Sequence, residues 1–476
     1  MKYPILLSLL ALAFSLKAQE DQIKLNQDQQ DYYEYEDDFL SAAFHQSRRD
    51  SLRALMPEGT AAVLFSAPER NRSNDVYYEY HQDPNFYYLT GLREPNSMLV
   101  LFKEAIYFQG QETTEMVFVQ ERNPSSEIWN GRRLGVDGAI KRLEIQTVLA
   151  NTTFKNLALP FDSLKRVYFQ KPYAMEEQDI EESASLKGLF HHFEQKVDSF
   201  SPIAETHLGM MMAKLRQVKT EEELSLLRKA INITCEAQNE LMRKITPEMA
   251  EYETEAIIEY VFKRNGAEYP GFPSIQGSGE NSCILHYTSN RRPLKNGGLL
   301  VSDVGAEYHA YTADVTRTIP PDGKFSKEER KVYNLVLEAQ KAGIEAAKVG
   351  NSFWAPHQAA RKVIAEGLVK LGITEKESAV GDYFMHGTSH YLGLDVHDAG
   401  MYMPLEAGNV ITVEPGIYIA EGSDCDAKWW NIGVRIEDDI LIREEGPENL
   451  SAASPRTIAE IEALMEEEWE VRPLRF

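Results

Sequence analysis

The second half of the chain carries two aspartates whose spacing can bring them together. Asp303 lies in the apolar segment 299–304, and Asp314 follows eleven residues later within 310–318. If these segments pair as a hairpin, we expect the two aspartates to face each other directly, with Cβ atoms about 5 Å apart. Two carboxylates this close repel unless a cation lies between them, and paired metal ions lie about 3.5–4 Å apart. Ordinary turn chemistry explains two aspartates at strand ends equally well.

Histidines are concentrated in one short segment. His386, His390 and His397 lie close together in a chain that has only 11 histidines. Gly387 and Gly393 disfavour a helix, so we expect a loop that enters a strand. A single histidine in such a loop is more often structural, but three of them indicate a functional site.

Two glutamates complete the candidate set. Glu414 ends the apolar segment 410–414 and is followed at once by Pro-Gly, which predicts a turn that exposes its carboxylate. In the segment 432–442, Arg435 and Glu437 share one face of the predicted strand. An ion pair between these two residues is therefore the structural alternative to a functional role for Glu437.

The candidate set offers four carboxylates and one imidazole, from Asp303, Asp314, His390, Glu414 and Glu437. Oxygen-rich sets of this kind favour hard divalent cations, with manganese preferred over metals that select thiolates. Four negative charges balance two dications. A hydroxide bridging the two ions is then expected at neutral pH, because bound metals lower the pKa of water.

The elements that must position these residues are predicted to form two domains, since 476 residues exceed what one hydrophobic core usually serves. Apolar runs at 61–65, 98–102 and 116–119 alternate with helical patterns and predict an α/β domain over 41–205. From 206 to 476, helices are grouped with strands at 299–304, 310–318, 410–414 and 432–442. That grouping, with apparently antiparallel strands, predicts an α+β domain.

Helix starts are marked by local signals. Thr220-x-x-Glu223 and Ser326-x-x-Glu329 are capping boxes, and the second predicts a helix that runs towards Gly350. Thr246-Pro247 predicts a helix with proline at its first position. A last helix is predicted within 456–476.

Composition and charge limit the possible partners. Hydrophobic residues make up 43% of the chain and charged residues 26%, which is typical of globular proteins. A net charge of −24 disfavours nucleic acid and anionic membranes as partners, because phosphate binding requires clustered cations. Three scattered cysteines do not form a disulfide framework or a zinc knuckle.

The N-terminus has the pattern of an export signal. Lys2 precedes an apolar run over 5–16, which predicts a signal peptide over 1–19, cleaved near Ala18 or Gln19. A polar, flexible lead-in is predicted over 20–40. The apolar run is too short to span a bilayer comfortably, so we expect an exported protein, periplasmic or secreted, without membrane insertion.

These motifs resemble the pita-bread metallopeptidases, and most closely the aminopeptidase P family. The segments 303–314, 386–398, 412–416 and 433–438 match the five-ligand pattern of that family in order and spacing, and 81–91 resembles its N-terminal signature. The resemblance covers nearly the whole chain after the signal. It implies a pita-bread catalytic domain preceded by a smaller α/β domain of the creatinase/prolidase type. One departure is Ala310, where the family commonly has glycine beside the ligand hairpin.

The resemblance implies a role for each candidate ligand. Asp303 would bind one of two divalent metals, His390 and Glu414 would bind the other, and Asp314 and Glu437 would bridge both. Glu414 would also carry a proton from the bridging water to the leaving proline nitrogen, which is general acid–base catalysis.

Further residues match positions that contact substrate in the family. His397 would contact the substrate carbonyl and stabilise its tetrahedral intermediate. His286 and His386 would line the pocket, and Tyr418 would line the proline site. Arg435 would orient the substrate or the glutamate two residues later.

The resemblance implies an aminopeptidase that removes the residue before a proline, with manganese as the expected metal. Proline forms a tertiary amide that lacks the N–H by which most proteases hold extended substrates, so such bonds need a dedicated enzyme. The nearest alternative is a prolidase restricted to Xaa-Pro dipeptides. A more distant one is a pita-bread binding protein without catalysis. Family members are usually dimers or tetramers, so we expect a homo-oligomer.

Overall fold

The computed structural model describes residues 36–172, 184–197 and 205–467. The predicted signal peptide over 1–19 and most of the lead-in over 20–40 lie outside the described residues. By its internal contacts the chain divides at Ser41, and the fold described below is that of the second unit, Ala42–Phe476. Within the described ranges, no helix is both long and apolar enough to cross a bilayer.

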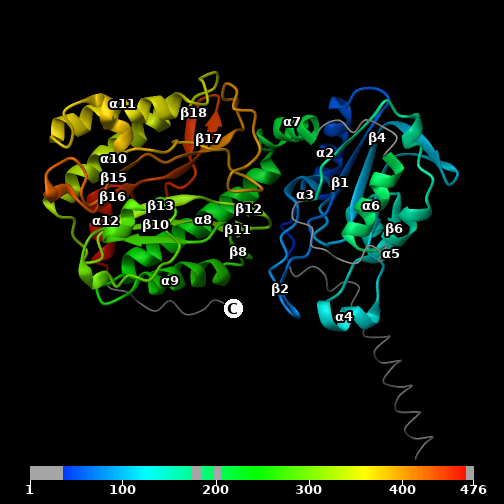
Figure 1. The fold of residues 1–476 in the computed structure, drawn as a ribbon, viewed down its shortest axis with the longest axis horizontal. Coiled ribbons are helices and arrows are strands. Elements are labelled where there is room, and N and C mark those ends of the chain that lie inside the picture. The colour runs from blue at the N-terminus through cyan, green and yellow to red at the C-terminus, as the bar shows by residue number, and fades with distance from the viewer. Residues whose placement is uncertain (1–35, 173–183, 198–204, 468–476) are drawn as a thin grey trace, which may run out of the picture. The chain divides into compact units, whose positions relative to one another are not determined.

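The first part of this unit is a five-stranded sheet with the order β6-β5-β4-β1-β7 (Figure 1). The β1–β4 and β4–β5 pairs are antiparallel, whereas β5–β6 and β1–β7 are parallel. All three strands predicted here are confirmed. The strands are β1 (Thr60–Phe65), β4 (Met98–Phe108), β5 (Gln111–Val119), β6 (Val148–Ala150) and β7 (Arg166–Phe169), with a small separate hairpin of β2 (Asn71–Ser73) and β3 (Val76–Tyr77).

Helices cover both faces of this sheet. The helices of this part are α2 (Ala42–Leu55), α3 (Pro84–Thr90), α4 (Pro124–Asn130), α5 (Gly135–Leu143) and α6 (Leu186–Val197), of which α4 has no buried residue. On one face, Phe65 meets Phe190 and Phe193 of α6 edge-on, at centroid distances of 5.4 and 5.5 Å. The alternate residues Ala62 and Leu64 are buried on the other face. Burial on both faces explains why these strands read as unbroken apolar runs.

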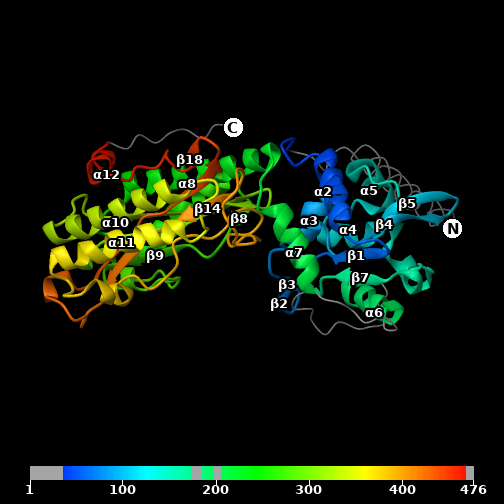
Figure 2. The ribbon, with the colours of Figure 1, turned by 90° about the horizontal axis from the view of Figure 1, so that it is seen from above.

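The second part contains further helices, two of which begin at their predicted capping boxes. They are α7 (Glu205–Arg216), α8 (Glu221–Lys244), α9 (Glu251–Arg264), α10 (Lys327–Ala346), α11 (Ala355–Leu371) and α12 (Ile458–Met465). The capping boxes predicted for α8 and α10 are both formed. The last predicted helix is confirmed as α12, although residues 468–476 lie outside the described range. Helices α10 and α11 lie side by side in both views (Figure 2).

The start predicted for α9 is wrong. Thr246-Pro247 lies in a turn, where Met249 N donates to Thr246 O at 3.2 Å, and the helix begins at Glu251. Ala250 is held in extended conformation by a β-bridge to Pro293, a contact that is distant in sequence. The local proline signal was therefore overridden by tertiary pairing.

The remaining strands form two antiparallel sets, so the predicted α+β class is confirmed. The first set packs against α8 and α9 and contains β8 (Tyr269–Pro270), β9 (Ile275–Ser278), β10 (Leu300–Val304), β11 (Ala306–Tyr308), β12 (Tyr311–Thr312) and β13 (Val315–Ile319). The second set packs against α10 and contains β14 (Val410–Val413), β15 (Gly416–Ile419), β16 (Ile432–Arg435), β17 (Asp438–Arg443) and β18 (Gly446–Asn449).

Each set contains a long hairpin that is interrupted in its middle. In the first hairpin, β10 and β11 pair with β13 and β12, and the ladder breaks at Gly305 and at Ala313-Asp314. A Cβ on Gly305 would lie 1.7 Å from the Ala313 carbonyl oxygen, so only glycine permits this crossing. In the second hairpin, β14 and β15 pair with β17 and β16, and the ladder breaks at Glu414 and Glu437. Three of the four candidate carboxylates therefore stand in a break.

The register corrects one prediction. Asp303 pairs with Thr316 and Val304 with Val315, so the position opposite Asp314 is Gly305. The two aspartates are diagonal neighbours on one face, not directly opposed residues, because a two-residue turn fixes the register. Direct opposition occurs in the second hairpin instead. There Val413 pairs with Asp438 and Gly416 with Arg435, which leaves Glu414 opposite Glu437.

The turn that fixes the first register is strained. His309 and Ala310 connect β11 to β12 with φ of 50° and 70°, values that two-residue hairpin turns require and glycine adopts most easily. We predict that Ala310→Gly raises the free energy of unfolding by about 1 kcal/mol, because the relief of left-handed strain exceeds the entropy that glycine adds to the unfolded chain. Denaturant unfolding of the metal-free protein measures this change.

Ala306→Gly is the matched control, since Ala306 lies in β11 and pairs with Pro270. That variant should lower the free energy of unfolding. Equal destabilisation by both substitutions would contradict the interpretation of the turn.

Candidate metal centre

Three candidate ligands from distant parts of the chain converge on one point. Ligand atoms of Asp314, His390 and Glu437 all lie within 4.8 Å of one another. His390 Nε2 lies 3.4 Å from Asp314 Oδ2 and 3.7 Å from Glu414 Oε1. Each hairpin break supplies carboxylates. The histidine comes from the predicted loop 386–398, which is bonded along β14. Tyr391 bridges to Ile411, and His390 O accepts from Thr412 N at 3.0 Å.

Asp303 lies beside the same centre, where its charge raises the pKa of Asp314, and it is held by an arginine. Arg435 Nη2 donates to Asp303 Oδ2 at 2.6 Å, and both side chains are almost fully buried. The alternative ion pair between Arg435 and Glu437 is not formed. Glu437 Oε2 instead accepts a hydrogen bond from Thr316 Oγ1 at 2.6 Å. The strand ends after Arg435, so the two side chains do not share one regular strand face as predicted.

Several carboxylate oxygens in the centre have no partner among the described residues. Asp303 Oδ1, Asp314 Oδ1 and Glu437 Oε1 are buried and accept no hydrogen bond there. A buried ionised oxygen without a partner is strongly unfavourable. Oxygens of this kind are the ligands that hard divalent cations select. The donor set therefore fits divalent metal ions.

Electrostatics lead to the same conclusion. Burial, followed by repulsion from Asp303, raises the pKa of Asp314 well above its ordinary value. Burial, followed by repulsion from Asp314 and Glu414, does the same to the pKa of Glu437. Burial raises the pKa of Glu414 to about 7, although His390 and Arg435 oppose the shift. These carboxylates hold protons in the absence of cations, and divalent ions would take the place of those protons.

Arg435 also begins a chain of hydrogen bonds that leads to His386. Arg435 Nη1 donates to the Tyr418 hydroxyl at 2.9 Å, which leaves the hydroxyl proton for His386 Nε2 at 2.9 Å. His386 Nδ1 then donates to the Gly387 carbonyl at 2.7 Å. This network assigns a neutral His386 protonated on Nδ1. Burial and then the charge of Arg435 lower its pKa to about 4, which agrees with a neutral ring.

The remaining predicted histidines lie at the open side of the centre. The rings of His397 and His390 meet edge-on, with centroids 4.4 Å apart, and the His397 side chain is exposed. His286 is exposed on the turn after the 3-10 helix Gly279–Cys283, and the preceding carbonyl, Leu285 O, accepts from Arg435 Nη2 at 3.4 Å. Desolvation, followed by the charge of His390, lowers the pKa of His397 although Asp395 opposes the shift, so its ring is neutral at pH 7.

Sequence reasoning missed three polar residues that support the ligands. Thr316 Oγ1 bridges Glu437 and Arg435, the latter through Arg435 Nε at 3.2 Å. Thr412 Oγ1 accepts from His390 N at 3.2 Å, and Asp439 Oδ2 accepts from Asp314 N at 3.3 Å. Each of the three lies two residues from a candidate ligand in its own strand segment. Because strand side chains repeat every two residues, that spacing is a usable signal.

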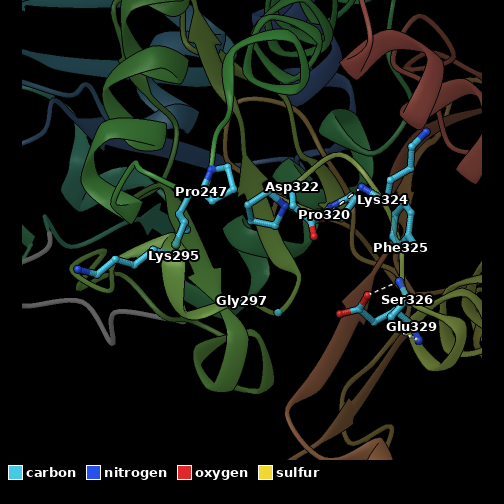
Figure 3. Close-up of a pocket in the computed structure, with 12 residues that line it drawn as sticks. Pro247, Lys295, Gly297, Pro320, Asp322, Lys324, Phe325, Ser326 and Glu329 are labelled. Carbon is cyan, nitrogen blue, oxygen red and sulfur yellow. Dashed lines mark hydrogen bonds between the residues drawn. The ribbon is translucent and has the colours of Figure 1, made fainter.

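A pocket of about 500 Å³ is lined by none of the candidate site residues (Figure 3). Its walls come from Pro247, the turn over 294–298 and the segment 320–329 that leads into α10. Both acids in the wall make local hydrogen bonds: Asp322 accepts from Lys324 N, and Glu329 accepts from Ser326 N in the helix cap. With no histidine or cysteine in its lining, the pocket does not offer a second metal-ligand set.

Comparison with known proteins places both parts of the chain. Residues 225–444 match the model of metallopeptidase family M24, and residues 45–162 match the aminopeptidase P N-terminal domain. The Xaa-Pro aminopeptidase of Escherichia coli (strain K12) is 39% identical over 440 residues, which cover 90% of this chain and 98% of that protein. The Xaa-Pro aminopeptidase of Haemophilus influenzae is also 39% identical, over 88% of this chain and 96% of its own length.

The fold agrees with the sequence comparison. The solved structure of aminopeptidase P from E. coli with the inhibitor Pro-Leu superposes with a TM-score of 0.80 at 37% identity, covering 90% of this chain and 98% of that one. The smaller α/β part and the larger antiparallel part described above thus correspond to the two matched models. The chain belongs to the aminopeptidase P family, and its catalytic domain is the pita-bread domain of the M24 metallopeptidases.

Proposed function

We infer that this chain is a metal-dependent aminopeptidase that hydrolyses the bond between an N-terminal residue and a proline in second position. The observation that carries this function is the convergence of all five candidate ligands, three of which present buried oxygens without a partner in the described residues. The comparisons support the substrate class, because relatives matched over nearly their full length are named Xaa-Pro aminopeptidases.

We propose that two divalent ions, most favourably manganese, are held by this centre. The residues that would hold them are Asp303, Asp314, His390, Glu414 and Glu437. Four carboxylates and one imidazole, with no thiolate, support manganese over softer metals. When bound, such ions lower the pKa of water, so that hydroxide is available at neutral pH.

Glu414 is the residue best placed to carry protons. Its side chain is partly exposed, and Oε2 lies 3.7 Å from His386 Nδ1 while Oε1 lies 3.7 Å from His390 Nε2. In this role Glu414 accepts a proton from the attacking water and delivers it to the proline nitrogen. That nitrogen has no hydrogen of its own and must gain one to leave as an amine.

His397 is placed to hold the substrate carbonyl. Its neutral ring has one N–H to donate, and its exposed position beside His390 leaves that donor accessible to substrate. A donor aimed at the carbonyl oxygen stabilises the negative charge that develops there during attack. Tyr418 would line the proline site and Arg435 would orient the substrate or Glu437, as the resemblance implies.

Both alternatives are less well supported. A prolidase would use the same ligands, but the relatives matched over most of this chain carry the aminopeptidase name. A non-catalytic binding protein would not need the complete ligand set. Here five side chains from separate segments meet in one place.

The substrate class is tested with purified protein and manganese. We predict cleavage of Xaa-Pro-Xaa peptides and little release from Xaa-Ala-Xaa peptides. Glu414→Ala should lower kcat/KM by at least about 10²-fold, the usual contribution of general acid–base catalysis. Glu421→Ala, an exposed glutamate seven residues further along, is the control and should retain activity. Cleavage of Xaa-Pro dipeptides alone would establish a prolidase, and equal release from alanine peptides would refute the substrate assignment.

The metal assignment predicts a pH dependence of stability. In metal-free protein, the pKa of Glu414 rises from 4.5 to about 7, and the pKa values of Asp314 and Glu437 shift in the same direction. The folded state then binds more protons than the unfolded state above about pH 4.5. Stability is therefore full below that pH and is lost as the pH rises through about 7.

Thermal unfolding from about pH 5 to about pH 8 measures this effect. In the presence of chelator, we expect Tm to fall as the pH rises. Added manganese should raise Tm and make it independent of pH. Glu414→Gln should flatten the slope in chelator. A manganese-insensitive Tm at pH 8, with no metal found by elemental analysis, would rule out the centre.

We also propose that the chain is exported, periplasmic or secreted, and assembles as a dimer or tetramer. Lys2, the apolar run over 5–16 and Ala18 support export. The resemblance to a family whose members are usually dimers or tetramers supports a homo-oligomer. Protein recovered from cells that express the full chain should have a mass that corresponds to cleavage near Ala18 or Gln19, and should sediment as a dimer or tetramer. An intact Met1 would refute export, and a monomer would refute assembly.

A further inference from the structure

Three charged side chains are buried together beside the loop that carries His397. Asp398, the next residue in the chain, accepts from Lys219 Nζ at 2.8 Å through Oδ2, and its Oδ1 is paired with Arg216. All three side chains are at most 6% exposed. Burial alone would raise the pKa of Asp398, but Arg216 and Lys219 hold it below its ordinary value. The carboxylate is therefore ionised and fully paired.

Burial of these three charges disfavours folding, and none of them contributes a ligand to the metal centre. Each buried charge loses its hydration, and apolar side chains of similar volume often stabilise a fold equally well. None of the three residues is a candidate ligand. Arg216 is held in turn by Asn85, whose Oδ1 accepts from Nη1 at 2.8 Å. A buried triad of this kind favours a role in fixing geometry.

The linker between α7 and α8, residues 217–220, is bonded along the segment that follows His397. Gln217 Oε1 accepts from Met401 N at 3.0 Å, and Gln217 O accepts from Asn409 Nδ2 at 3.0 Å. Lys219 N donates to Gly408 O at 2.8 Å. The linker thus holds the segment 398–409 at both of its ends, and Asp398 is the point nearest to His397.

A short path of hydrogen bonds connects Asp398 to the ligand His390. Tyr391 O accepts from Asp398 N at 2.9 Å and from His390 Nδ1 at 3.0 Å. A Cβ on Gly393 would lie 2.2 Å from Asp398 Oδ2, so the loop closes on this carboxylate only with glycine there. The loop 391–398 is therefore closed by the backbone of Asp398 and packed against its side chain.

His397 has little else to hold its ring. Its backbone N–H donates to Asp395 Oδ1 at 3.0 Å, but its imidazole makes no hydrogen bond to any described residue. The edge-on contact with His390, at 4.4 Å between centroids, is therefore maintained chiefly by the position of the backbone. That position is set one residue later, at Asp398.

We propose that Asp398 is a positioning residue for His397, and that the buried Arg216–Asp398–Lys219 triad anchors the loop so that the His397 ring stays beside the ligand His390. This inference rests on the proposed function for its kinetic consequence only. The triad acts through His397 and does not touch substrate.

Lys219→Met tests the proposal with the smallest risk to folding, because the Arg216–Asp398 pair remains. We expect kcat/KM for an Xaa-Pro-Xaa peptide to fall about tenfold, mainly through kcat, since a displaced His397 loses contacts made in the transition state. Asp398→Asn, which leaves two buried cations facing a neutral amide, should cost about a hundredfold. If Asp398→Asn fails to fold, Lys219→Met alone decides.

A double-mutant cycle with His397→Ala separates positioning from general destabilisation. In that background, Lys219→Met should cause no further loss of kcat/KM, because its effect passes through the missing ring. Arg49→Met is the matched control: it removes another buried ion pair, with Glu115 at 2.8 Å, and should lower Tm without changing kcat/KM. Full additivity of Lys219→Met and His397→Ala would overturn the proposal.

Two readouts do not depend on turnover. The crystal structure of Lys219→Met should show the His397 ring moved from its contact with His390, while elemental analysis should show unchanged manganese content. An undisturbed ring, or loss of metal through His390, would overturn the proposal. If the wild-type protein does not cleave proline-second peptides, the proposed function falls, and the ring position in the variant still decides this inference.

Discussion

Mutual repulsion among four clustered carboxylates, three of them buried and one partly exposed, is the constraint on which this structure depends. Asp303, Asp314, Glu414 and Glu437 are brought into one space from which water is largely excluded. Arg435 is the only permanent cation paired with any of them in the described residues, and it supplies one charge. The fold therefore supplies too little positive charge for these acids, so that protons or divalent cations must make up the difference. Such an arrangement is reasonable only where cations complete it.

The two interrupted hairpins explain how a protein can build this arrangement. A continuous ladder would direct each side chain by strand alternation alone, whereas a break frees one or two positions to turn inward. Glu414 and Glu437 stand opposite each other in one break, and Asp314 stands in the other. Thr316 Oγ1 then joins the hairpins through Glu437. The same hydrogen bonds that close the sheets also fix the spacing of the carboxylates.

Much of the candidate site could be predicted from sequence, because residue type and order survive without coordinates. Residue type and order predicted the five candidate ligands, the strands and the capping boxes of α8 and α10. Contacts between residues that are distant in sequence could not be predicted in the same way. The Asp303–Asp314 register depends on a two-residue turn, and Ala310 stands in that turn where a glycine would have indicated it. The partner of Arg435 depends on where its strand ends. The predicted start of α9 was wrong for a similar reason, because Ala250 forms a β-bridge to the distant Pro293.

Two groups of buried acids in this molecule illustrate opposite solutions to the same problem. Asp398 is surrounded by two cations that keep its pKa low, so its charge is satisfied within the protein and can serve only to hold structure. Asp314 and Glu437 have raised pKa values and oxygens that accept no hydrogen bond from the described residues, so their ionised forms require cations. Ion pairing thus separates Asp398, which the protein neutralises with its own cations, from Asp314 and Glu437, whose oxygens are suited to bind metal ions. Asp398 N and His390 Nδ1 both donate to Tyr391 O. The ion-paired Asp398 can therefore orient the ligand histidine that lies beside Asp314 and Glu437.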